Sequence, residues 1–153
     1  MFDLKEFVKG KCISGVYFIS ESPIKFFKAQ AVSSDFHLMH LQGLPITNQY
    51  DFHSQLRHIS QCPWQGFTWD GTLDCIRDLS WISASLKIIV FDNIDQFAHF
   101  DGEGFTIAIR VLADATEHWR VRKADKPFYT LLSGDNALVA DIRKYVPNLI
   151  SLY

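Results

Sequence analysis

The chain has 153 residues, of which 48% are hydrophobic, 21% charged and 14% aromatic. This balance predicts one globular domain, because disordered chains are poorer in apolar residues and carry more net charge. The 15 basic and 17 acidic residues nearly cancel, whereas a dedicated nucleic-acid-binding protein is expected to carry a clear basic excess. The composition therefore disfavours that class of function.

The first twelve residues mix charged and apolar side chains, which is not typical of a secretion signal. No uncharged stretch reaches the roughly 18 residues that a membrane-spanning helix needs. The three cysteines, Cys12, Cys62 and Cys75, are odd in number and form no Cys-x-x-Cys pair, which disfavours both a zinc site and a disulfide framework. We therefore expect a reduced, cytoplasmic protein with no metal and no cofactor.

Three extended segments are predicted near the N-terminus, at residues 15–20, 25–32 and 36–42. Turn-forming residues separate them, Ser22 and Pro23 in the first gap and residues 33–35 in the second. The first two segments are expected to pair as a β-hairpin, which makes residues 1–35 a β extension of the main domain.

The period of the apolar residues then changes to that of helices. Phe52, Leu56 and Ile59 predict a helix over residues 51–59. Thr68 is a plausible N-cap for a second amphipathic helix, whose apolar residues are Trp69, Leu73, Ile76 and Leu79.

Two further strands and one long helix follow. Residues 86–91 form an almost continuous apolar run, which is typical of a strand covered on both faces. Apolar residues at helical spacing predict a helix over residues 105–122, and residues 127–133 predict another strand. The resulting order from residue 36, β-α-α-β-α-β, indicates a parallel sheet. Residues 36–135 form the expected main domain, and residues 136–153 a tail whose short helix ends before Pro147, all within one compact unit.

Acidic residues concentrate in the middle of the chain. Residues 64–104 hold seven acidic and two basic side chains, a net charge of −5. Asp70, Asp74 and Asp78 recur every four residues and so share one face of the second helix. This stripe is either a solvated helix face or an acidic patch for a cationic partner.

Two tryptophans lie beside the acidic stripe. Trp69 shares the apolar face with Leu73 and is expected to pack in the core. Trp64 lies in the preceding loop, between Pro63 and Gly66, where we expect an exposed anchor for a partner.

No catalytic arrangement is evident. The sequence contains no HExxH, GxSxG or phosphate-loop pattern, and its six histidines are scattered. One alternative is a phosphoacceptor or small-ligand domain acting at Asp92, which ends an apolar strand. Such domains also need acidic residues after the first strand to hold magnesium, and here that strand runs into Gln42 and Gly43.

Several of these segments together resemble the barstar family of intracellular ribonuclease inhibitors. They are residues 46–53, the run PWQGFTWDGTLDCIRDLSW (63–81), the strand KIIVFDN (87–93) and the helix VLADATEHW (111–119). The family signature is a glycine followed by an aspartate, an aromatic and an Asp-Cys-Leu run. The matching residues here are Gly66, Asp70, Leu73, Asp74, Cys75 and Ile76.

The resemblance implies a small α/β fold with a three-stranded parallel sheet, and a non-enzymatic protein that plugs the active site of a barnase-like ribonuclease. It implies that Asp74 mimics a phosphate in the nuclease, that Asp70 pairs with basic residues there, and that Trp64 stacks over a catalytic histidine. Gly66, Thr68 and Asp78 belong to the same binding segment.

The sequence departs from the family pattern at several of these positions. Leu73 replaces an aromatic residue, Gln65 replaces a second loop aromatic, and Thr68 replaces an asparagine. Thr106 stands where the family has a glutamate that engages the nuclease, although Glu103 is close enough to substitute. The expected function is an immunity protein that binds a basic ribonuclease toxin and is monomeric when free. An interaction module with a non-nuclease partner stays an alternative.

Overall fold

A computed structural model describes residues 3–64 and 68–152. Within these residues one sheet has the strand order β2-β3-β4-β1-β5, and every strand pairs in parallel. The strands are β1 (Gly15–Ile19), β2 (Phe36–Gln42), β3 (Leu86–Asp92), β4 (Phe128–Ser133) and β5 (Ile150–Leu152).

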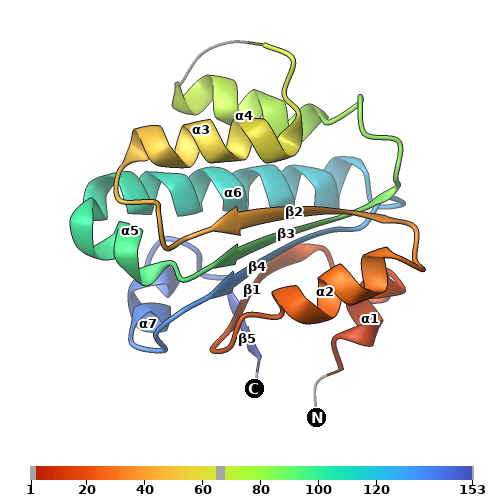
Figure 1. Cartoon of the computed structure of the whole chain (residues 1–153), viewed down its shortest axis with the longest axis horizontal. Helices are drawn as coiled ribbons and strands as arrows, with labels where there is room; N and C mark the ends of the chain where they lie inside the picture. Colours follow the sequence, from red (N-terminus) through yellow and green to blue (C-terminus); the bar gives the residue numbers. More distant parts are fainter. Residues whose placement is uncertain (1–2, 65–67, 153) are drawn as a thin grey trace.

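Helices connect the strands and cover both faces of the sheet. They are α1 (Lys5–Val8), α2 (Ile24–Ala31), α3 (Gln49–Ser60), α4 (Trp69–Asp78), α5 (Asp95–Phe100), α6 (Gly102–Arg122) and α7 (Leu138–Arg143). Figure 1 shows α3, α4 and α6 on one face and α1 and α2 on the other. None of the helices in the described ranges is long and apolar enough to cross a membrane.

The central strand β3 is buried along its whole length, which confirms the prediction that it is covered on both faces. Ile89 and Phe91 join the core beneath α3, α4 and α6, whereas Ile88 and Val90 join the core beneath α1 and α2. This alternation follows from the two-residue period of a strand. The predicted helices at 51–59 and 105–122 are confirmed as α3 and α6.

The expected N-terminal hairpin is wrong. Residues 24–31 form the helix α2, which buries Phe27 and exposes Lys25 and Lys28. The segment is rich in lysine, alanine and glutamine, which favour helices, and its apolar residues Ile24 and Phe27 are three apart. A parallel sheet also requires a crossover rather than a tight turn between consecutive strands.

The expected three-stranded sheet is also wrong, because the sheet has five parallel strands. β1 lies between β4 and β5, with Gly15 opposite Tyr129 and Tyr17 opposite Ile150. The short elements α1, α5 and β5 were not predicted, since three to six residues are too few to show a period. The α/β class stands, and the proposed boundaries at residues 35/36 and 135/136 stay predictions.

Candidate partner-binding site

The helix α4, which carries the acidic stripe, begins where the sequence predicts. Thr68 is its N-cap, and the Thr68 Oγ1 accepts a hydrogen bond from the Gly71 amide at 3.0 Å. Cys75, Ile76 and Leu79 are buried on the inner side of the helix and its end. The spacing of these apolar residues therefore places one side of α4 against the core and leaves the opposite side exposed to solvent.

The C-terminal end of α4 is held by α6. The Trp119 Nε1 donates to the Ile76 carbonyl at 2.8 Å, and the Lys123 Nζ donates to the Arg77 carbonyl at 3.0 Å. The last carbonyls of a helix lack partners within it and carry partial negative charge, so a lysine there is stabilising. These bonds fix the position of α4, and hence of its acidic face, on the body of the protein.

The acidic stripe faces solvent. Asp70 and Asp74 are exposed and Asp78 is partly exposed. Within residues 3–64 and 68–152, none of the three carboxylates forms an ion pair, although Asp78 accepts a hydrogen bond from the Ser80 amide at 3.2 Å. Like charges at this spacing are slightly destabilising, so the stripe contributes nothing to the fold by pairing.

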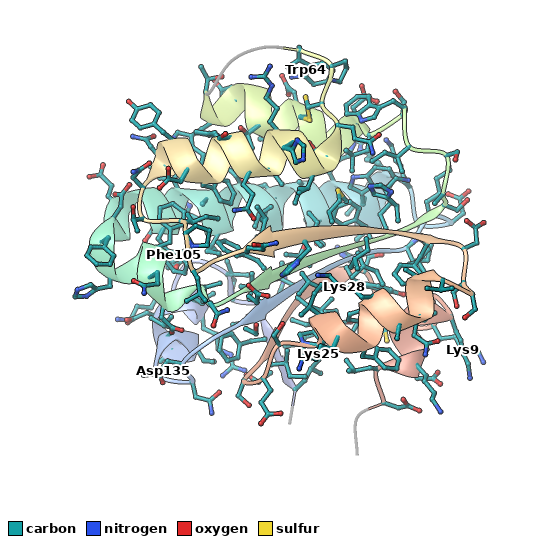
Figure 2. All side chains as sticks on the ribbon, viewed as in Figure 1. Lys9, Lys25, Lys28, Trp64, Phe105 and Asp135 are labelled. Carbon is teal, nitrogen blue, oxygen red and sulfur yellow. A yellow bond between two sulfur atoms is a disulfide. The ribbon has the colours of Figure 1, made fainter. Side chains whose placement is uncertain are left out.

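Trp64 is 37% exposed and lies beside the first turn of α4. Its Nε1 donates to the Gly71 carbonyl at 3.3 Å, and its ring meets the Trp81 ring edge to face, with the centroids 5.4 Å apart. Figure 2 shows Trp64 on the far side of α3 and α4 from the sheet. The ring is thus oriented by the protein while a third of it stays open to solvent.

Trp69 and Leu73, the apolar residues in the first half of α4, are less exposed than Trp64. Trp69 is partly buried and packs against the core, with its ring centroid 4.3 Å from that of His53, as predicted. Leu73 is also partly buried against the core. A partner contact by Leu73 stays a prediction, as does one by Gly66, which lies outside the described residues.

The first turn of α6 lies close to the start of α3. Asp101 joins the two helices, because its carboxylate accepts from the Gly104 amide at 3.0 Å and from the Gln49 amide at 3.2 Å. Glu103 is exposed in this turn, and the Thr106 Oγ1 donates to the Gly102 carbonyl at 2.9 Å. The starts of α3, α4 and α6 lie on the same side of the molecule, at the left in Figure 1.

Asp101 was not singled out from the sequence, although an aspartate directly before a helix is a common N-cap. The fold thus brings Glu103 and Thr106 to the end of the helical layer at which α4 begins. Whether either residue contacts a partner stays a prediction.

A disulfide joins Cys62 to Cys75, whose Cα atoms are 6.0 Å apart. The expectation that the cysteines are unpaired is therefore wrong for these two. An odd number of cysteines does not exclude one bridge, since Cys12 is left as the free thiol. The bridge joins the loop that carries Trp64 to the helical residue directly after Asp74.

Asp92, the alternative site, is used within the fold. Its carboxylate is 2.6 Å from the His40 Nε2 and accepts from the Gly43 amide at 3.2 Å, and the side chain is only 8% exposed. The pairing of β2 with β3 brings these residues together, which the sequence cannot show because they are about fifty positions apart. In the described part of the chain, no group of three or more His, Cys, Asp or Glu side chains is arranged to hold a metal ion.

The fold is similar to several solved structures at low sequence identity. The Aeropyrum pernix ORC1 protein in complex with DNA is 10% identical, with a TM-score of 0.60, over 98% of this chain and 42% of that one. Drosophila ORC bound to AT-rich DNA and Cdc6 is 11% identical, with a TM-score of 0.59, over 97% and 50%. The Aeropyrum pernix ORC2 protein, in ADPNP and ADP complexes, is 14% identical, with a TM-score of 0.58, over 97% and 44%.

This chain thus spans about half the length of those chains. At such low identity the likeness concerns the fold alone. It includes the N-terminal segment and the five-stranded sheet, which departs from the small sheet expected from the sequence.

The sequence matches no curated protein. It does match the family model described as barstar, the barnase inhibitor, over residues 36–133, nearly two thirds of its length. These residues include β2, β3 and β4 and all of α3 to α6, and the chain therefore belongs to the barstar family.

Proposed function

We propose that this protein is an inhibitor that binds and blocks the active site of a basic, barnase-like ribonuclease through α4 and the loop before it. The observation that carries the proposal is the exposed face of α4, where Asp70 and Asp74 have no ion-pair partner among the described residues. A ribonuclease active site binds phosphate through cationic side chains, and a carboxylate on a rigid helix offers such a site an anion of similar charge.

Within this proposal Asp74 is the central residue, because it lies midway along the stripe between Asp70 and Asp78. On binding it would lose its water and be surrounded by guanidinium and ammonium groups. Trp64 would supply apolar contact area at the edge of the acidic face, since oriented tryptophans are frequent anchors of interfaces. The surrounding contacts would come from Gly66, Thr68, Leu73, Glu103 and Thr106.

The geometry of Asp92 supports a binding protein over a phosphoacceptor. A carboxylate that already accepts from Gly43 and pairs with His40 is poorly placed to attack a phosphoryl group. In the register of the sheet, its neighbour on β2 is Gln42 rather than an acid. We infer that Asp92 has a structural role, in which its hydrogen bonds join the end of β3 to the end of β2. We also infer that the protein is not an enzyme.

We do not extend the DNA or nucleotide binding of the ORC proteins to this chain. Nucleotide phosphates in many parallel α/β proteins are held by a strand–GxxxxGK[ST]–helix segment, whose glycines let backbone amides surround the phosphates. No such pattern occurs in this sequence. The segment between β1 and α2 reads Ser-Glu-Ser-Pro (residues 20–23) and contains neither a glycine nor a lysine.

A further part of the proposal concerns the biological setting. A tight inhibitor of a ribonuclease protects the cell that makes the enzyme, so we infer an immunity protein paired with a ribonuclease toxin. It would act in the cytoplasm and would be a monomer until it meets the toxin. The toxin itself would be basic, because its surface must complement the stripe on α4.

The test is a titration of purified barnase-like ribonucleases with this protein, following RNA cleavage and the heat of binding. We expect cleavage to stop at one inhibitor per enzyme. The double variant Asp70→Asn/Asp74→Asn should lose inhibition, whereas the matched control Asp114→Asn/Asp125→Asn, which neutralises two exposed acids outside α4, should retain it. No binding to any basic ribonuclease would contradict the proposal, and recovery of a non-nuclease partner through α4 would favour the interaction-module alternative.

A further inference from the structure

We propose that the Cys62–Cys75 disulfide is a reversible, dithiol-sensitive staple that holds the Trp64 loop against α4 in the arrangement that binds the partner. The expected effect on partner binding rests on the proposed function, but the disulfide and its effect on the Trp64 loop can be tested without any partner. Nothing in the barstar match assigns a role to this pair of cysteines.

The bridge links the two segments that form the candidate site. Cys62 is two residues before Trp64, and Cys75 directly follows Asp74. Cys75 is only 3% exposed and is anchored in the core beside Ile76. A covalent bond to Cys75 therefore ties the loop to the most firmly held part of α4.

Few other contacts hold this loop within the described residues. The Cys62 amide donates to the Arg57 carbonyl at 3.3 Å, and Trp64 has its bond to Gly71 and its contact with Trp81. Pro63 and Trp64 themselves are exposed. Without the bridge, the position of Trp64 would depend on one long hydrogen bond and one ring contact, which solvent and thermal motion can disrupt.

The two sulfur atoms differ in accessibility. Cys62 is partly exposed and lines two hollows, a small one of about 20 Å³ that Cys75 also lines, and an open one of about 410 Å³ that Cys62 shares with Arg57 and Gln61 but not with Cys75. Cys75 is buried. An external thiolate therefore reaches Cys62 through the open hollow more readily than it reaches the buried Cys75, which sets the direction of exchange.

The reaction is a two-electron reduction by a dithiol, such as a thioredoxin-like protein. One thiolate of the dithiol attacks the Cys62 Sγ, the Cys62–Cys75 bond breaks, and its electron pair stays on the Cys75 Sγ. The Ser60 Oγ donates to the Arg57 carbonyl at 3.3 Å and lies 3.5 Å from the Cys75 Sγ, so its hydroxyl can turn from that carbonyl to donate a hydrogen bond to the leaving thiolate.

The second thiol of the reductant then attacks the reductant sulfur that is bonded to the Cys62 Sγ in the mixed disulfide. This bond breaks and the Cys62 thiolate is released. Both cysteines take up protons, and the reductant leaves as a disulfide. The exchange is reversible, so an oxidised dithiol can rebuild the staple by the same steps.

Reduction should weaken partner binding by removing preorganisation. A loop that is already ordered loses less conformational freedom on binding than a loop that must be ordered by the partner. We expect the reduced protein to bind about tenfold more weakly, with most of the change in the dissociation rate.

The first experiment counts thiols by alkylation and mass spectrometry. When the alkylation is carried out in denaturant, protein that has not been reduced should be labelled at Cys12 alone, and protein treated with dithiothreitol should be labelled at all three cysteines. Quenching of Trp64 fluorescence by acrylamide, assigned by difference from a Trp64→Phe variant, should increase on reduction. Labelling of Cys62 and Cys75 in protein freshly oxidised by a dithiol catalyst, or unchanged quenching, would overturn the staple.

The second experiment measures binding to the ribonuclease with and without dithiothreitol. The Cys62→Ser variant should bind about tenfold more weakly and should not respond to the reductant, whereas the control Cys12→Ser should respond as the wild type does. A wild-type affinity that ignores the reductant would overturn the inference. If the oxidised protein binds no ribonuclease at all, the proposed function fails, and the alkylation and quenching results still decide the staple.

Discussion

Two aspartates of this protein show how the environment of a single residue decides what it can do. Asp74 is exposed and has no ion-pair partner in the described residues, whereas Asp92 is buried against His40 and the Gly43 amide. The first carboxylate is available to a partner and adds nothing to folding. The second stabilises the ends of β2 and β3 and is unavailable.

Asp74→Ala should therefore separate affinity from stability. Loss of one member of a buried charge pair costs about 2–5 kcal/mol of binding free energy, so the affinity for the ribonuclease should fall by at least about thirtyfold. The melting temperature should stay the same or rise slightly, because the crowding by Asp70 and Asp78 is relieved. Calorimetric titration and thermal melts measure the two effects.

The matched control for this experiment is Asp114→Ala, an exposed acid on α6, which should change neither quantity. Wild-type affinity in Asp74→Ala would show that α4 does not enter the active site. Unfolding of the variant would show instead that Asp74 is structural.

His37 makes stability depend on pH. Burial lowers the pKa of His37 below its ordinary value of 6.5, and the nearby Lys87, its partner in the β2–β3 register, lowers it further. The unfolded chain therefore binds more protons than the folded one as pH falls through that ordinary value. The stability contributed by neutral His37 is present above pH 6.5 and is lost below it.

We expect the free energy of unfolding, from urea titrations, to decrease between about pH 7.5 and about pH 5.5. His37→Gln should make this slope shallower, whereas His99→Gln, at an exposed position of α5, should leave it as it is. The slope will not vanish, because burial lowers the pKa of His53 in the same direction. An identical slope in His37→Gln and the wild type would rule out this origin.

At the scale of elements, α4 depends on what holds its two ends. Ten residues are too few for a stable isolated helix. Its N-terminal amides are capped by Thr68, and its C-terminal carbonyls bind Trp119 and Lys123 of the α6 end. The acidic stripe is thus presented by a helix whose order comes from its caps and its packing.

Thr68→Ala should destabilise the protein by about 1 kcal/mol, because the Gly71 amide loses its partner. Thr68→Ser keeps the capping oxygen and should retain most of the wild-type stability. Urea unfolding of the two variants makes the comparison. Equal destabilisation in both would show that the methyl group of Thr68, rather than its hydroxyl, is what matters.

At the scale of the whole molecule, the exposed acidic stripe on α4 is a local concentration of charge in a chain whose total charge is only −2. Residues 64–104 carry a net charge of −5, which includes the exposed stripe on α4, whereas α6 holds equal numbers of acidic and basic residues. Lys9, Lys25 and Lys28 are exposed at α1 and α2 on the other face. Figure 2 shows these lysines on the opposite side of the sheet from Trp64. Such a distribution orients an approaching cationic partner toward α4.

Association with the ribonuclease should therefore slow as salt is added. Stopped-flow measurements between about 50 mM and about 500 mM sodium chloride should show a falling association rate constant, with a smaller rise in the dissociation rate constant. The Asp70→Asn/Asp74→Asn variant should show a weaker dependence than the wild type. An association rate that does not change with salt would count against an acidic binding face.

The elements with strong local signals were predicted well. β3 follows from its continuous apolar run, α6 from six apolar residues at helical spacing, and α4 from Thr68 and its amphipathic pattern. Residues 25–32 are predicted as an extended segment, whereas residues 24–31 form the helix α2, whose apolar residues Ile24 and Phe27 are too few to show a helical period. Local pattern decides an element only when the pattern is long enough.

The sequence by itself determined the α/β class, the order of elements from β2 to β4, the acidic stripe on α4 and the family to which the chain belongs. Each of these follows from neighbouring residues or from a contiguous motif. Only the tertiary structure decided that β1 and β5 join the sheet, that Cys62 bonds to Cys75 and that the His40 ring lies within hydrogen-bond distance of Asp92. These features join residues far apart in the chain or in short elements, and their free energy arises from packing and pairing that appear only when the chain is folded.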